Sequence, residues 1–225
     1  MSRLLDVVGF KLEMLRPPFF DKDVVDKFDN TYGAHGFNLL LQILYSDLIL
    51  GMSAISSDKS SNSPSIKSIL KLLESKELIE ALKTDFCKGE RITHIGPWDE
   101  DSKKSFKERE KDIRQGTFEE VLDKAKSLYK GLEKTELYKR IRKSRNKTVA
   151  HYEMREDNAV IRQTNLSDFS LEWELDDLED YYNKIKTIIE KILLLTSGEH
   201  YNYEFSNRQH KDIANDFWKR ASSNP

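Results

Sequence analysis

The distribution of proline limits what this chain can fold into. The stretch 98–224 contains no proline and few glycines, and it is rich in Lys, Glu and Leu. All five prolines lie outside it, at Pro17, Pro18, Pro64, Pro97 and Pro225. Because proline interrupts helix interiors and glycine weakens them, this composition favours helices over a sheet. We therefore predict an all-α fold, an antiparallel bundle of four to five main helices.

Turn and capping signals divide the chain into helices. Pro17 and Pro18 are expected to end a first helix, and Pro64 to open another. The predicted helices cover 3–15, 22–31, 37–57, 64–75 with a continuation to 86, 104–115, 117–129, 134–155, 173–196 and 207–221. We expect residues 1–20 to form an N-terminal extension, residues 21–197 the bundle, and residues 198–225 a C-terminal helix that packs on it.

Charge and cysteine content narrow the environment of the protein. The 225 residues carry a net charge of −2, so any attraction to nucleic acid or to a membrane has to come from a local patch. The single cysteine, Cys87, excludes an internal disulfide and suits a reducing compartment. The most apolar run, 37–55, is interrupted by Gln42, Ser46 and Asp47, which makes it too polar to span a bilayer comfortably. We therefore predict a cytoplasmic protein without a membrane partner.

The apolar stripe of the helix predicted at 134–155 changes character along its length. An α-helix turns by about 100° per residue, which puts Leu137 and Ile141 on one face. The later positions on or beside that face are Ser144, Arg145, Thr148, His151 and Tyr152. A helix that only packed against a core would gain by continuing with Leu or Ile there. The change indicates either a functional site or a helix end that simply turns polar.

The same helix is strongly basic. From Lys134 to Lys147 it carries seven basic residues and one acidic residue, Glu136. Such a strip can hold phosphates and attract RNA. The alternative is a solvated face balanced by the acidic residues of the next long helix, Glu172, Glu174, Asp176, Asp177, Glu179 and Asp180.

A carboxylate lies within the long apolar helix predicted at 37–57. Asp47 falls on the side that carries Gly51 and several leucines, and a carboxylate on an apolar face rarely stays unpaired. Arg145 or His151, across the bundle, is one expected partner. The alternative is a capped or water-linked Asp47.

The segment RNKTVAH combines an Arg, a polar residue directly after it and a His after five intervening residues. In an all-α bundle, Arg145, Asn146 and His151 in this arrangement resemble the signature of the HEPN superfamily. The end of the long apolar helix, YSDLILGMSAISSD, looks most like the abortive-infection, AbiU-type branch. The resemblance covers roughly residues 20–197.

This resemblance implies a metal-independent endoribonuclease that acts as a homodimer, as a toxin or antiphage effector, without a cofactor. Because RNA supplies its own nucleophile, His151 would transfer protons and Arg145 would stabilise the charge on the phosphate, while Asn146 would orient one of the groups. The basic and polar neighbours expected to bind RNA are Arg142, Lys143, Lys147, Thr148 and Tyr152. Asp47 and Ser144 are expected to support them.

The resemblance also bears on protein partners. Some relatives are toxins silenced by a nucleotidyltransferase antitoxin, which modifies a Tyr two residues after the His. Here Tyr152 follows His151 directly, Glu153 stands two residues after the His, and Met154 has no such role, so the chain departs from that pattern. The alternative function is a non-catalytic HEPN-like binding or dimerisation module. The presence of Arg145, Asn146 and His151 together favours the nuclease, since a scaffold has no need for all three.

Overall fold

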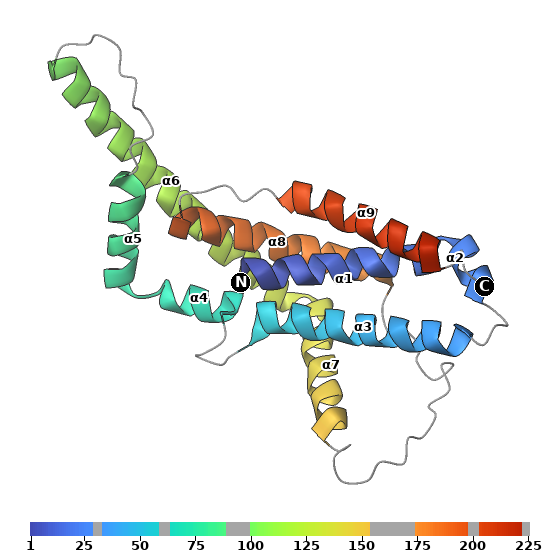
Figure 1. Cartoon of the computed structure of the whole chain (residues 1–225). Coiled ribbons are helices and arrows are strands. Elements are labelled where there is room, and N and C mark those ends of the chain that lie inside the picture. The colour runs from blue at the N-terminus through green and yellow to red at the C-terminus, as the bar shows by residue number, and fades with distance from the viewer. Residues whose placement is uncertain (29–32, 59–63, 89–99, 154–173, 198–202, 222–225) are drawn as a thin grey trace.

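The computed structural model describes residues 1–28, 33–58, 64–88, 100–153, 174–197 and 203–221. Within these ranges every regular element is an α-helix, which confirms the predicted all-α fold (Figure 1). The helices are α1 (Ser2–Phe20), α2 (Lys22–Phe28), α3 (Gly33–Ser57), α4 (Ile66–Leu72), α5 (Lys76–Lys88), α6 (Glu100–Lys134), α7 (Glu136–Glu153), α8 (Leu175–Ser197) and α9 (Tyr203–Ala221).

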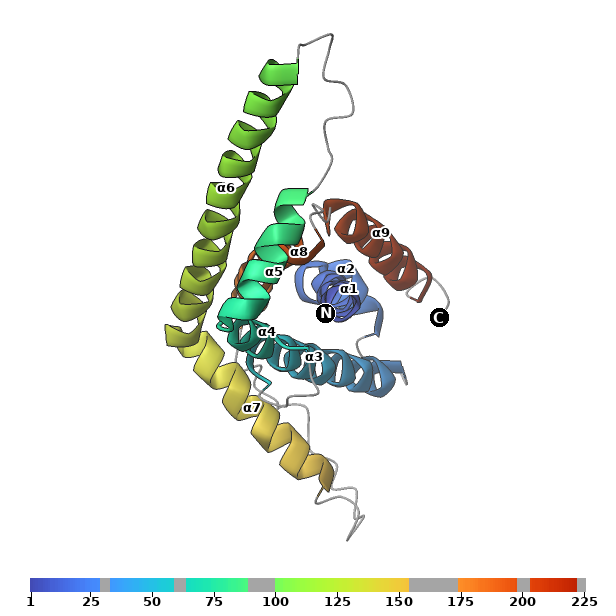
Figure 2. The ribbon, with the colours of Figure 1, turned by 90° about the vertical axis from the view of Figure 1, so that its left-hand side faces the viewer.

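Helix α1 lies in the middle of the molecule. Figure 2 looks along it and shows α3, α8 and α9 around it. Its apolar residues recur at helical spacing, and Leu5, Val8, Leu12 and Leu15 are almost completely buried. Residues 1–20, which we expected to be an extension outside the bundle, are therefore part of the core.

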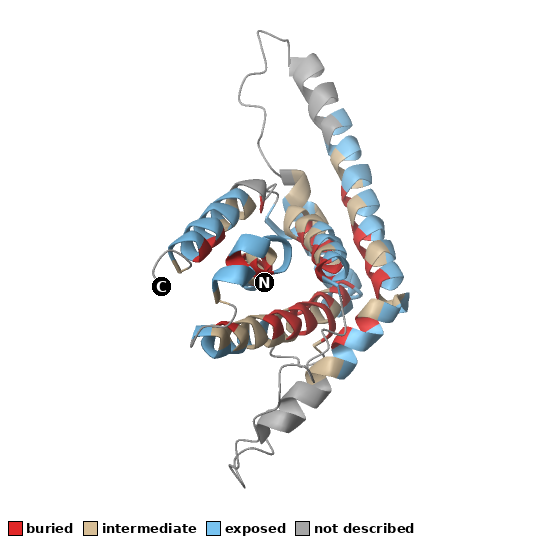
Figure 3. Ribbon diagram, turned by 90° about the vertical axis from the view of Figure 1, so that its right-hand side faces the viewer, coloured by how far each residue is buried: buried red, intermediate tan, exposed pale blue. Residues whose placement is uncertain are grey.

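The main core runs between α1, α3, α6 and α8. Helix α8 contributes the longest apolar face, and its buried side chains include Leu178, Tyr181, Ile185, Ile189 and Ile192. Figure 3 shows how these faces turn inward while the opposite faces stay exposed. Each fully buried Leu or Ile contributes about 1.5–3 kcal/mol, so packing rather than helix propensity holds these helices together.

The last helix is attached to the first through a backbone carbonyl. We expected α1 to end at Pro17 and Pro18. Instead it continues through both prolines to Phe20. Because proline has no backbone N–H, Pro18 cannot donate to the carbonyl four residues earlier, that of Met14. The indole N–H of Trp218, on α9, donates to this carbonyl instead, at 2.8 Å.

A small second cluster forms around the same contact. Met14, Val24, Phe37, Ala214 and Trp218 bury their side chains together, and they come from α1, α2, α3 and α9. The C-terminal helix α9 thus packs along α1 and completes this cluster.

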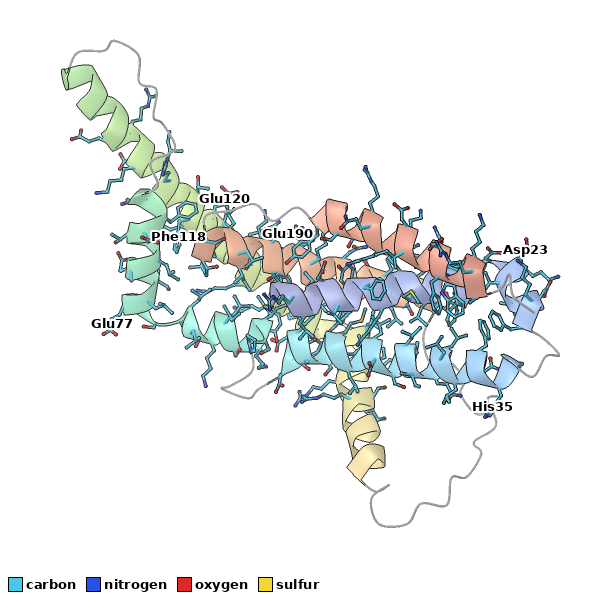
Figure 4. All side chains as sticks on the ribbon, in the orientation of Figure 1. Asp23, His35, Glu77, Phe118, Glu120 and Glu190 are labelled. Atoms are coloured by element: carbon cyan, nitrogen blue, oxygen red, sulfur yellow. The ribbon has the colours of Figure 1, made fainter. Side chains whose placement is uncertain are left out.

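The division of residues 64–134 into helices also differs from the sequence expectation. The helix expected from 64 to 86 is divided, since α4 ends at Leu72 and α5 begins at Lys76. The helices expected at 104–115 and 117–129 are instead a single helix, α6, which is 35 residues long. Its first half extends beyond the rest of the molecule (Figure 2), whereas Phe118, labelled in Figure 4, is buried against Phe86 of α5.

Helix α3 is, among the described residues, the one helix whose length and composition would allow it to cross a membrane. The core helix of a water-soluble protein satisfies the same criteria. In this fold α3 packs against α1, α4, α7 and α8, and nine of its residues are buried.

Candidate functional site

A single residue, Thr135, separates α6 from α7 and sets the direction of the motif helix. Its hydroxyl donates to the carbonyl of Leu132 at 2.7 Å, and its oxygen accepts from the backbone N–H of Tyr138 at 3.2 Å. Thr135 therefore ends α6 and caps the N-terminus of α7. As a result α7 leaves α6 at an angle and runs past α3, as Figures 1 and 2 show.

Burial on the core-facing side of α7 decreases toward Arg145, the last residue of the helix whose surroundings are described. Tyr138 and Ile141 are buried against the core, and Leu137 is partly buried. Ser144 and Arg145, one turn further along, are only partly covered, while Arg142 and Lys143 are exposed. The structure thus contains the change from apolar to polar that the sequence indicated.

A hydrogen-bonded group of tyrosines fixes α7 against the end of α3. The hydroxyl of Tyr138 lies 3.2 Å from that of Tyr129 on α6. Tyr129 donates to the carbonyl of Ser56 at 2.9 Å, and Tyr181 on α8 donates to the Ser56 hydroxyl at 2.8 Å. Burial, and then the hydrogen bond with Tyr138, raise the pKa of Tyr129 far above its usual value, so this hydroxyl stays a neutral donor.

An ion pair extends this group to α4. Lys67 donates to Glu133 at 2.8 Å, and Glu133 lies 3.4 Å from the Tyr138 hydroxyl. Burial raises the pKa of Glu133, but the hydrogen bond and charge of Lys67 outweigh it, and the net effect is a lowered pKa. Glu133 is therefore ionised at neutral pH and ties α4, α6 and α7 together.

The carboxylate that faces Arg145 is Asp58, directly after α3. Nη2 of Arg145 lies 3.5 Å from Oδ2 of Asp58, and their side chains are 34% and 19% exposed. The expected pairing of Arg145 with Asp47 is wrong. Asp47 is half exposed and pairs with Lys11 of α1 at 3.1 Å. The reason is that α1 runs alongside α3 and brings an amine close to Asp47.

Asp58 was not among the residues predicted from sequence. One signal could have identified it: a carboxylate directly after a helix is unfavourable, because the helix dipole is negative at that end. An Asp in such a place, following the three small polar residues Ser53, Ser56 and Ser57, points to a cation from elsewhere in the fold.

Two acidic residues of α8 pair with cations outside the basic strip of α7. Glu179 pairs with Arg16 of α1, and Asp180 pairs with Lys184 of its own helix. Asp176 lies in the first turn of α8, where the helix dipole favours a negative charge. On α7 itself Lys139 pairs with Glu136 at 2.6 Å. By sequence, the strip from Lys134 to Lys147 carries seven basic residues and one acidic residue.

The remaining predicted site residues are placed only by their backbone. Asn146, Lys147, Thr148, His151 and Tyr152 all fall on α7, and their side chains lie outside the described part of the structure. An α-helix puts His151 about 9 Å beyond Arg145 along the axis and about 120° around it. Among the residues whose surroundings are described, no group of three or more His, Cys, Asp or Glu side chains could hold a metal ion.

Comparison with known families identifies the domain. The family model for AbiU2, a HEPN family, matches residues 4–217 and so extends from α1 to α9, further at both ends than the resemblance in the motif region indicated. No curated protein and no solved structure matches the chain. Since the match covers nearly all of the described fold, the chain belongs to the AbiU2 family of HEPN domains, a family associated with abortive infection.

Proposed function

We propose that this protein is a metal-independent endoribonuclease that acts in the cytoplasm as a defence effector or toxin, with its site at Arg145, Asn146 and His151. The observation that carries the proposal is the position of Arg145. Its side chain is partly covered and lies next to the carboxylate of Asp58, on a helix whose sequence carries more basic than acidic residues. A guanidinium in such surroundings is suited to binding a phosphate.

The reaction needs proton transfer and charge stabilisation. The RNA 2′-oxygen attacks the adjacent phosphorus, and the bond from phosphorus to the 5′-oxygen of the next nucleotide breaks. His151 takes the 2′-hydroxyl proton or gives a proton to the leaving 5′-oxygen. Arg145 stabilises the added negative charge on the phosphate. The products are a 2′,3′-cyclic phosphate and a 5′-hydroxyl, and the atoms balance without water or a metal.

A second copy of the chain would complete the site. On one helix Arg145 and His151 are separated by about 9 Å and about 120°, which is a loose arrangement around one phosphate. Helix α7 points away from the rest of the molecule beyond α3, so a second α7 can approach it (Figure 1). Two such helices related by a twofold axis would surround a phosphate with an Arg from one chain and a His from the other.

The first experiment measures cleavage of total RNA and of tRNA in EDTA. We expect His151→Ala to lower the cleavage rate at least about 100-fold, because general acid–base catalysis typically contributes that much. The matched control is His35→Ala. His35 is exposed near the start of α3 (Figure 4), about 34 Å along that helix from Asp58.

The wild type, His151→Ala and His35→Ala are compared only after all three are shown to be equally folded and to have the same oligomeric state. Cleavage by the wild type and by His35→Ala, with cyclic-phosphate ends and with loss in His151→Ala, supports the nuclease. Equal cleavage by all three proteins would trace the activity to a contaminant. The absence of cleavage on every RNA would favour the non-catalytic HEPN module instead.

A further inference from the structure

We propose that Asp58 is the positioning residue of this site: its carboxylate holds the Arg145 guanidinium where it meets the RNA phosphate. This inference rests on the proposed ribonuclease function. It assigns a role to a residue on a different helix, 87 positions earlier in the chain than Arg145. Asp58 acts through Arg145 and does not itself touch the RNA.

The backbone of Asp58 is fixed independently of Arg145. The buried hydroxyl of Ser65 donates to the Asp58 carbonyl at 2.6 Å. Ser65 also caps α4, because its oxygen accepts from the N–H of Ser68 while its own N–H donates to the Ser68 hydroxyl. The start of α4 thus holds the residue that follows α3.

The other partner is fixed by a separate set of contacts. Arg145 lies seven residues after Tyr138, on the same side of α7. Tyr138 is held by Tyr129 and Glu133 on α6. Because the backbone of Asp58 and the part of α7 that carries Arg145 are each held by hydrogen bonds of their own, the fold brings the two residues together without relying on the ion pair alone.

The geometry of the contact leaves room for a phosphate. Asp58 approaches one terminal nitrogen of the guanidinium, Nη2, at 3.5 Å, which is longer than the 2.7–2.9 Å of a strong charge-assisted hydrogen bond. A contact through one nitrogen orients the planar group without using its full fork of donors. Arg145 is also one third exposed, so an RNA phosphate can reach it.

The site of Asp58 is otherwise costly for a carboxylate. It follows the last residue of α3, where the helix dipole repels negative charge, and its side chain is four-fifths covered. A residue needed only to end the helix would be Gly or Asn, which avoid that cost. The guanidinium of Arg145 is one group that offsets this cost, and Asp58 in turn orients it.

The test is steady-state cleavage of a short RNA in EDTA by Asp58→Asn. This change keeps the shape of the side chain and the backbone carbonyl that Ser65 binds. We expect kcat to fall about 10- to 100-fold, the size of effect that a small misplacement of a catalytic group produces. We expect KM to stay equal or to fall, because a negative charge that repels phosphate has been removed.

Two further variants separate positioning from folding. Asp58→Glu keeps the charge and should recover part of kcat. Asp216→Asn removes an exposed carboxylate paired with Arg220 on α9 and should leave kcat and KM unchanged. In an Arg145→Lys background, Asp58→Asn should lower kcat far less than in the wild type, since both changes disturb one interaction.

The outcomes distinguish the two proposals. If the wild type cleaves, His151→Ala does not, and Asp58→Asn cleaves like the wild type, only the role of Asp58 is overturned. The role of Asp58 is also overturned if the fall in kcat of Asp58→Asn is explained by a lower folded fraction. It is likewise overturned if Asp58→Asn lowers kcat equally in the Arg145→Lys background. If the wild type cleaves no RNA, the ribonuclease proposal fails first and the role of Asp58 fails with it.

Discussion

Trp218 replaces, with its indole N–H, a backbone donor that the chain lacks at Pro18. We expect Trp218→Phe to lower the free energy of unfolding by about 1–3 kcal/mol, because the buried carbonyl of Met14 loses its partner. In a Pro18→Ala background a backbone N–H is present at position 18 and can serve that carbonyl. In that background Trp218→Phe should lower the free energy of unfolding by about 1 kcal/mol less than in the wild type.

Urea unfolding of the four proteins in this cycle gives the interaction energy directly. An equal cost of Trp218→Phe in both backgrounds would show that the indole contributes packing alone.

Residue-level contacts across the fold were the part that the sequence predicted least well. Periodicity placed Arg145 beside the apolar face of its helix, and its side chain is partly covered in the structure. The same reasoning selected Asp47 as its partner, because a carboxylate among leucines looks buried. It could not take account of Lys11, which belongs to a helix that we had placed outside the bundle. Partners on other helices depend on packing, which a pattern along one helix does not contain.

At the scale of helices, the close approach of α1 and α3 depends on Gly51. A methyl group added there would lie 2.6 Å from Cγ2 of Val8. Val8 is completely buried, and a valine in a helix has one strongly preferred rotamer, so its methyl group cannot turn away. We expect Gly51→Ala to destabilise the protein by about 1–2 kcal/mol, because the overpacking outweighs the gain in helix propensity.

The matched control is Gly131→Ala on α6. Gly131 is exposed, and an added methyl group would meet no atom within 4 Å. This change should stabilise the protein by up to about 1 kcal/mol. Opposite signs in urea unfolding would support the steric account, and a gain in both variants would contradict it.

Helix boundaries could be predicted where a local signal dominates. The helices α3, α7 and α8 lie close to their predicted ranges, because long apolar or charged patterns define them. Helix α1 passes its two prolines because Trp218, about 200 residues later, serves the carbonyl that Pro18 leaves without a donor. Helix α4 begins at Ile66 rather than at Pro64, because its N-cap is Ser65, which also binds the carbonyl of Asp58.

At the scale of the whole molecule, a site shared between two copies has a consequence that a single-chain site does not. If Arg145 of one chain works with His151 of the other, Arg145→Ala and His151→Ala proteins should restore activity when they are mixed. After subunit exchange at equal concentrations, about half of the dimers are mixed. Each mixed dimer contains one intact Arg and one intact His.

Cleavage in EDTA by the mixture, compared with each variant alone, is the measurement. Two different affinity tags on the chains show that mixed dimers have formed. Inactive mixtures that contain such dimers would mean that each chain builds its own site.

The contact between Trp218 and Met14 also has a consequence for synthesis. The two residues are 204 positions apart, so a ribosome that adds about 5–20 residues per second needs roughly 10–40 s to pass from one to the other. During that time Met14, Val24 and Phe37 have emerged without the Ala214 and Trp218 that complete their cluster. The nascent chain therefore exposes apolar surface until its last helix is made, and this interval is when chaperones and aggregation compete for it.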